Sequence, residues 1–187
     1  CRWFAERRKA GFAVFRTAFG TPGRASLRPE DVLAYLFWTK YAGPFHPILQ
    51  ELRAEGTPFA FQYTINGYGP TLEPQIPPLR LVLQDIEAVR LRLPSTACLE
   101  WRYDPIVLGR EWPAAWHLRN FRALARALQG VVSVVNVSVV EPYVKTVRRM
   151  GSVAAEVLYR NRRGVGVRHP EEIEAADIPG ERICFEI

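Results

Sequence analysis

Residues 98–105 constrain the fold most strongly, because apolar and charged side chains alternate along them until a proline. Side chains of a β-strand point alternately to its two faces. One face of this predicted strand is apolar and suits a covering helix: Leu99, Trp101 and Tyr103. The other face is charged: Glu100, Arg102 and Asp104. Pro105 has no N–H for the hydrogen bonds of a sheet, so we expect the strand to end there. We also expect the charged face to lie at a functional edge of the fold.

Two more predicted strands carry one polar face each. Residues 58–65 place Gln62, Thr64 and Asn66 on one side, and residues 131–140 do the same with Asn136 and Ser138. Central strands of a doubly wound sheet are apolar on both faces, which these strands are not. We therefore predict an α/β fold with mostly parallel strands and a polar lumen, a partial or truncated TIM-like (β/α) barrel. A complete barrel usually needs about 250 residues.

Strands and helices alternate along the chain, as expected for parallel βαβ units. The predicted strands are 12–16, 33–40, 58–65, 98–105 and 131–140. The predicted helices are 2–10, 44–55, 79–93, 113–129, 142–149 (extending towards 159) and a short acidic one at 170–176. The strand at 33–40 is nearly all apolar, so we expect it to be buried on both faces. Residues 21–24 are typical of a turn, which a short extended segment follows over 25–27. Residues 181–187 resemble the first turn of a helix.

The length of 187 residues indicates a single domain over 1–187. No apolar run reaches the roughly 18 residues needed to cross a bilayer, and there is no signal-peptide pattern, so we expect a cytoplasmic monomer. Three cysteines and three histidines show no metal-ligand spacing, and we predict no metal ligand. A single methionine, with Cys1 in first place, leads us to expect an incomplete chain.

The net charge is +6 and comes largely from arginine. Basic clusters at 7–9, 145–149 and 160–168 could contact phosphates, so a nucleic acid is a possible partner. Solvated helix faces explain the same clusters more simply.

The candidate site residues lie on the polar faces and at the strand ends. We assign catalytic roles to three of them: Asp104, Arg102 and Lys40. Asp104 would act as a base or hold a ligand by hydrogen bonds, Arg102 would bind a carboxylate or phosphate through two N–H groups, and Lys40 lies at the end of a strand. The alternatives are an Arg102 ion pair with Asp104 or Glu100, and a merely exposed lysine. The remaining candidates would hold a small-molecule ligand or cofactor by hydrogen bonds or, for Trp38, by stacking: Gln62, Thr64, Asn66, Trp38, Thr39, Glu100, Asn136 and Ser138. Polar packing and burial of the tryptophan are the alternatives for these.

Five motifs occur together in order: RPEDV at 28–32, LFWTK at 36–40, FQYT at 61–64, WRYDP at 101–105 and HLRNF at 117–121. With them the chain resembles a bacterial family called domain of unknown function 1848, over about residues 2–150. The family typically carries a C-terminal cysteine cluster similar to that of radical S-adenosylmethionine enzymes. The resemblance implies an iron–sulfur cluster and S-adenosylmethionine in the complete protein. These 187 residues contain no such cysteine cluster, and from the resemblance we expect the family's first strand to be missing from them.

Three functions follow as hypotheses. The first is the barrel core of a radical S-adenosylmethionine-like enzyme, whose polar lumen binds cofactor or substrate. The second is a nucleotide- or nucleic-acid-binding module that uses the arginine clusters. The third is a metal-free lyase or glycosidase that uses Glu100 and Asp104, although Arg102 between them makes an ion pair the simpler explanation.

Overall fold

The computed structural model describes residues 2–17, 19–140 and 185–186, which form a mixed α/β structure. The chain begins with helix α1 (Arg2–Ala10) and a hairpin of β1 (Phe12–Arg16) and β2 (Pro22–Ser26). Strands and helices then alternate: β3 (Tyr35–Thr39), α2 (His46–Ala54), β4 (Phe59–Thr64), α3 (Leu79–Arg90), β5 (Leu99–Ile106), α4 (Ala114–Ala127) and β6 (Val134–Val139). A short strand β7 (Phe185–Glu186) and three single 3-10 turns complete the described elements: Pro29–Asp31, Gly43–Phe45 and Thr96–Cys98.

The main sheet has four parallel strands in the order β3–β4–β5–β6, with β7 antiparallel at the edge of β6. Strand order therefore follows chain order, as in a (β/α) barrel and unlike a doubly wound sheet, whose order reverses. The described residues form an open sheet, and no closed barrel is seen in them. The parallel α/β prediction is confirmed, whereas the barrel stays a prediction.

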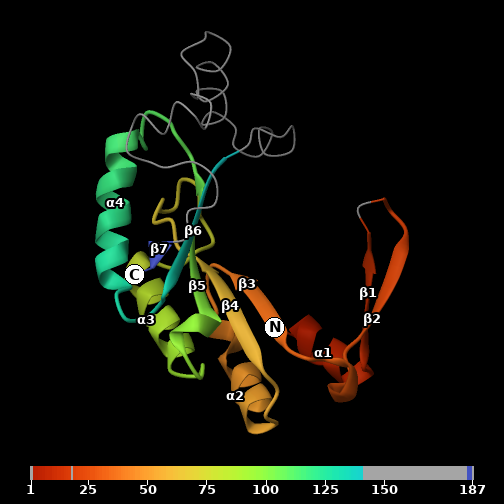
Figure 1. Cartoon of the computed structure of the whole chain (residues 1–187). Helices are drawn as coiled ribbons and strands as arrows, with labels where there is room; N and C mark the ends of the chain where they lie inside the picture. Colours follow the sequence, from red (N-terminus) through yellow and green to blue (C-terminus); the bar gives the residue numbers. More distant parts are fainter. Residues whose placement is uncertain (1, 18, 141–184, 187) are drawn as a thin grey trace.

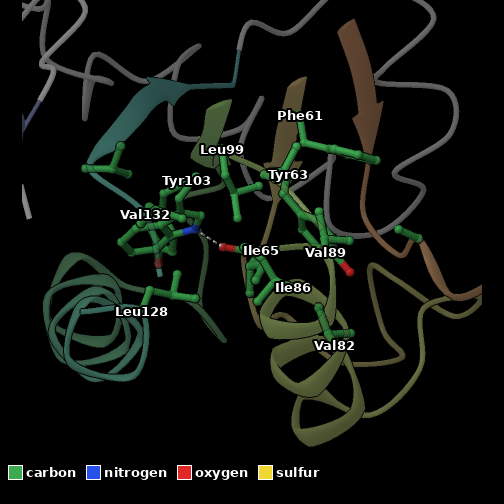
Figure 2. Close-up of a cluster of buried hydrophobic side chains, with 14 of the residues drawn as sticks. Phe61, Tyr63, Ile65, Val82, Ile86, Val89, Leu99, Tyr103, Leu128 and Val132 are labelled. Atoms are coloured by element: carbon green, nitrogen blue, oxygen red, sulfur yellow. Dashed lines mark hydrogen bonds between the residues drawn. The ribbon is translucent and has the colours of Figure 1, made fainter. Parts of the chain in front are cut away.

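One face of the sheet is covered by all three connecting helices (Figure 1). Each helix has apolar residues three or four positions apart, which places them on one side. These pack against the alternate apolar side chains of β4 and β5, among them Phe61, Tyr63 and Leu99 (Figure 2). Complete burial of an aliphatic or phenyl side chain stabilises a fold by about 1.5–3 kcal/mol. The opposite face of these strands is consequently the one left for polar residues.

Helix α1 attaches the N-terminal hairpin to the sheet. The ring of Phe4 lies edge-on to Tyr35 and Phe37, with centroid distances of 5.1 and 5.4 Å, and also contacts Phe45. An ion pair between Arg8 and Glu55 joins α1 to the end of α2. The hairpin itself projects away from the sheet (Figure 1).

Three local predictions are wrong. Strand β3 is buried on one face only, because it is the edge strand and its outward side chains Leu36 and Trp38 are exposed. Residues Pro22–Ser26 form a strand where we predicted a turn, because they pair with β1 residue by residue. Residues Phe185–Glu186 pair with β6 as a strand instead of opening a helix.

The helices predicted at 142–159 and 170–176 lie outside the described residues. Within the described part, no helix has the length and apolar character needed to cross a membrane.

Candidate functional site

The sheet face opposite the helices holds a hollow of about 480 Å³, here called the polar hollow. It is lined by residues of all four parallel strands: Trp38, Gln62, Glu100, Arg102, Asp104, Asn136, Val137 and Ser138. Strand register explains why they meet. Trp38, Gln62 and Glu100 form one row across β3, β4 and β5, and Arg102 pairs with Asn136 in the next row.

Asp104 is held by two partners at the carboxyl end of β5. Its Oδ2 accepts a hydrogen bond from the Arg102 guanidinium, and its Oδ1 accepts one from the Ser138 hydroxyl of β6. Arg102 also approaches the Gln62 Oε1 at 3.5 Å. The ion pair that we weighed as the alternative to a ligand-binding Arg102 is therefore present, and it neutralises both charges.

Glu100 is held differently, by two neutral amides from the neighbouring strands. Its Oε2 accepts hydrogen bonds from Gln62 Nε2 and Asn136 Nδ2, both at 2.9 Å. Its Oε1 receives no hydrogen bond from the described residues, and none of the ion pairs formed among them includes Glu100. A half-buried carboxylate thus keeps its negative charge uncompensated within the described structure.

Trp38 is 70% exposed, although it is the largest side chain of the hollow. Its indole lies 5.5 Å from the Arg102 guanidinium carbon, within the range of a cation–π contact. An indole exposed beside polar groups is a surface on which a planar ligand can stack. Of the two interpretations of Trp38, burial in a core is excluded by this exposure.

The carboxyl edge of β4 and β5 is fixed by Asn66. The Asn66 amide donates to the Asp104 carbonyl at 3.0 Å and accepts from the Asp104 N–H at 2.9 Å. Asn66 is 1% exposed and does not line the polar hollow. Strand β4 ends at Thr64, so the alternation that predicted Asn66 beside Gln62 no longer applies. We therefore correct its role to a positioning residue for Asp104.

A buried network lies behind this edge. His117 Nδ1 accepts from the Tyr103 hydroxyl at 2.8 Å, and its Nε2 donates to the Val107 carbonyl at 3.0 Å. Asn120 joins the same hydroxyl to the Asn66 carbonyl. Burial raises the pKa of Tyr103 to about 12, against an opposing hydrogen bond from Asn120. Burial lowers the pKa of His117, against an opposing hydrogen bond to Val107. His117 is thus neutral and has a structural role in this network.

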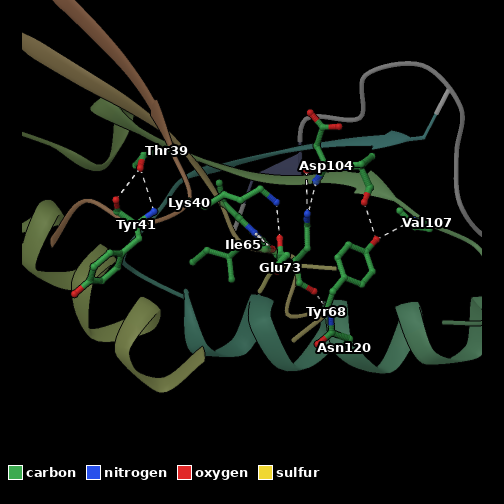
Figure 3. Close-up of polar contacts among 12 residues, drawn as sticks. Thr39, Lys40, Tyr41, Ile65, Tyr68, Glu73, Asp104, Val107 and Asn120 are labelled. Atoms are coloured by element: carbon green, nitrogen blue, oxygen red, sulfur yellow. Dashed lines mark hydrogen bonds and ion pairs between the residues drawn. The ribbon is translucent and has the colours of Figure 1, made fainter. Parts of the chain in front are cut away.

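Three predicted residues lie beside the hollow without lining it. Lys40 forms an ion pair with Glu73 of the loop between β4 and α3 (Figure 3). Thr39 Oγ1 bonds both the N–H and the carbonyl of Tyr41, which fixes the turn after β3. Thr64 lines a second pocket of about 310 Å³ under the same loop.

Two participants were missed from sequence, Glu73 and Val137. Val137 lines the hollow although alternation places it opposite Asn136, and no sequence signal indicated this. Glu73 is an acid within the Gly- and Pro-rich stretch after β4. Its lysine partner is distant in the sequence, so the pairing leaves no local pattern.

The described residues hold no group of three or more His, Cys, Asp or Glu side chains that could bind a metal ion. Cys98 lies immediately before β5, at the end opposite the carboxyl edge, with its Sγ 3.8 Å from Ser95 Oγ. This part of the chain therefore does not fit an iron–sulfur cluster. The arginine clusters at 145–149 and 160–168 lie outside the described residues.

Comparison with protein families decides the relationship. The model of one family, described as a domain of unknown function (DUF1848), matches residues 1–178. The chain belongs to this family. The DUF1848 match covers all the residues of the polar hollow. No curated protein and no solved structure matches the chain.

Proposed function

We propose that this DUF1848 chain is the ligand-binding core of a barrel-type α/β enzyme, and that a small organic molecule binds in the polar hollow. One observation carries the proposal: three charged side chains of β5 share a hollow with the exposed indole of Trp38. Ligand sites of parallel α/β proteins lie at the carboxyl ends of the strands, where Asp104 and Ser138 are found.

The pre-arranged contacts support binding. Hydrogen bonds within β5 and to β4 and β6 hold Glu100, Arg102 and Asp104 before any ligand arrives, so little side-chain entropy remains to be lost on binding. Asn66 fixes the backbone of Asp104 from behind. The exposed tryptophan adds a wide apolar contact to this polar frame.

A thermal-shift screen of small polar metabolites tests the proposal. A ligand present at about 100 times its Kd stabilises the folded state by about 2.7 kcal/mol. We expect a ligand that raises the Tm of the wild-type chain and fails to do so for Trp38→Ala. Trp3→Ala is the matched control, because Trp3 is 61% exposed on helix α1, outside the hollow. Ligands that stabilise Trp38→Ala as strongly as the wild type would contradict binding at the hollow.

The family resemblance adds a narrower proposal, a radical S-adenosylmethionine-like iron–sulfur enzyme. Because the described residues offer no ligand set for a cluster, its cysteines must come from elsewhere in the complete protein, and we derive no chemical step through it. The test is the iron and sulfide content, with the visible absorption spectrum, of the complete protein expressed without oxygen. About four irons per chain would support a [4Fe–4S] cluster. Absence of iron after anaerobic reconstitution would contradict it and leave the ligand-binding proposal standing.

A further inference from the structure

We propose that the polar hollow selects a positively charged ligand, a small planar organic cation whose ammonium or amidinium group binds Glu100 while its ring stacks on Trp38. This inference rests on the proposed function, since it names the class of molecule that the same hollow takes.

The charge of the hollow is negative once its internal ion pair is counted. Arg102 and Asp104 compensate each other, which leaves the Glu100 carboxylate. Among the described lining residues, Arg102 carries the positive charge, and its guanidinium is already bound. Lys40, the next cation along β3, is bound to Glu73. An anionic ligand would meet no unpaired cation among the described lining residues, whereas a cationic one meets an unpaired carboxylate.

The Glu100 carboxylate is also oriented for binding. Gln62 and Asn136 donate to the same oxygen, Oε2, from strands on either side of β5. Neutral donors fix the position of the group without neutralising it. The second oxygen, Oε1, has no hydrogen-bond donor among the described residues, so it remains available as an acceptor. A hydrogen bond from a charged donor to a carboxylate is about twice as strong as one between neutral groups.

Strand register sets the distance between the two recognition elements. Trp38, Gln62 and Glu100 lie in one row on three adjacent strands. Neighbouring strands are about 4.8 Å apart, so the row spans about 10 Å from Trp38 to Glu100. A bicyclic aromatic ring with an amine on a two-carbon chain has this extent. The contact between Arg102 and the Trp38 ring shows that the indole already accommodates a cation beside it.

Three probes of one shape separate charge from stacking: tryptamine, which is cationic; tryptophol, which is neutral; and indole-3-acetate, which is anionic. We would measure binding of each to the whole chain by isothermal titration calorimetry at low salt. We expect tryptamine to bind about tenfold more tightly than tryptophol, and indole-3-acetate to bind most weakly.

Glu100→Gln is the deciding variant, because it removes the charge and keeps an oxygen that accepts from Gln62 and Asn136. We expect it to lower the tryptamine affinity about tenfold and to leave tryptophol unchanged. Glu87→Gln is the matched control: it removes an equal charge from an exposed position on α3, outside the hollow, and we expect no effect. Circular dichroism of each variant verifies the fold.

The outcomes separate the inference from the proposed function. Equal tryptamine affinity in the wild type and Glu100→Gln, or tightest binding of indole-3-acetate, would overturn cation selection. If Trp38→Ala still abolished that binding, the hollow would remain a ligand site. If none of the three probes bound the wild type, cation selection by this row would be overturned, while the metabolite screen would still decide the proposed function.

Discussion

At the scale of single residues, buried polar groups hold the elements of the site in place. The clearest case is Asp85 of α3, which is 6% exposed. It accepts hydrogen bonds from the Ala42 N–H at 2.7 Å, from His46 Nε2 at 2.7 Å and from the Tyr63 hydroxyl. One carboxylate thus ties the connection after β3 and the strand β4 to the helix between β4 and β5. Burial, and then the bond to Asp85, raise the pKa of Tyr63 well above its usual value, so Tyr63 stays a donor.

Replacing Asp85 by alanine should therefore be strongly destabilising. Removal of the carboxylate leaves the Ala42 N–H and the Tyr63 hydroxyl buried without an acceptor, and each unsatisfied group costs about 1–3 kcal/mol. We expect Asp85→Ala to lower the free energy of unfolding by about 3 kcal/mol in urea titrations. Asp85→Asn, which keeps one acceptor oxygen, should lose less, and Glu30→Ala, at an exposed position, should change little. If Asp85→Ala were as stable as the wild type, the Asp85 carboxylate would not be what connects β4 and the segment after β3 to α3.

A second prediction concerns His117 and the pH dependence of the free energy of unfolding. The pKa of His117 is lowered in the folded chain, mainly because the side chain is buried. As the pH falls below about 6.5, the pKa of the unfolded state, the unfolded chain therefore takes up a proton on His117 more readily than the folded chain does. Its contribution to stability is therefore complete above pH 6.5 and decreases as the pH falls below that value. The loss reaches at most about 1.4 kcal/mol per pH unit.

Urea unfolding at pH 7.5 and pH 5.5 measures this effect. We expect the wild type to lose more stability between these values than His117→Gln, which cannot take up the proton. His46 is present in both proteins and cancels in the comparison. Equal losses would show that His117 does not titrate between the two states.

At the scale of elements, each strand depends on the packing of the helix beside it, and α1 differs from the other described α-helices in having no fully buried residue. Phe4 provides its aromatic contacts with Tyr35, Phe37 and Phe45. The other large aromatic residue of this helix, Trp3, is exposed and takes no part in the core. Besides the ion pair of Arg8 with Glu55, the hairpin that follows α1 therefore depends largely on Phe4 for its attachment to the sheet.

We expect Phe4→Ala to lower the free energy of unfolding by about 2 kcal/mol, less than for a fully buried phenylalanine because Phe4 is half-buried. It should also speed proteolytic cleavage in the hairpin before the sheet unfolds. Trp3→Ala, the adjacent aromatic substitution, should change stability by no more than about 0.5 kcal/mol. Similar losses in the two variants would show that α1 is not attached through Phe4.

Elements were predictable from sequence where one face is buried and the other polar. The alternation over 98–105 placed Trp101 in the core and Glu100 in the hollow correctly, because a helix covers one side of β5 only. The prediction failed for β3, because an apolar side chain at an edge strand looks the same in sequence as one in a core. The hairpin was missed because its turn lacks an Asn-Gly pair; it is closed instead by a bond from the Thr17 N–H to the Thr21 carbonyl.

At the scale of the whole molecule, one face of the sheet packs against the helices and the other carries the polar hollow. The four strands follow chain order and their helices share one face, so the polar residues of β4, β5 and β6 meet on the opposite face beside Trp38 of β3. Pairing within that face could not be predicted. The register that places Gln62 beside Glu100 depends on how β4 and β5 slide against each other, which local sequence does not encode.

The most direct test of the account is whether ligand-induced changes are confined to the polar face. We would titrate tryptamine into 15N-labelled protein and follow the Trp38 indole N–H and the side-chain amides of Gln62 and Asn136 by heteronuclear NMR. We expect shifts for these three groups, while the signals of the side-chain amides of Asn66 and Asn120, which lie behind the sheet edge, stay in place. Shifts confined to Asn66 and Asn120, or none near Trp38 at saturation, would contradict a ligand site in the hollow.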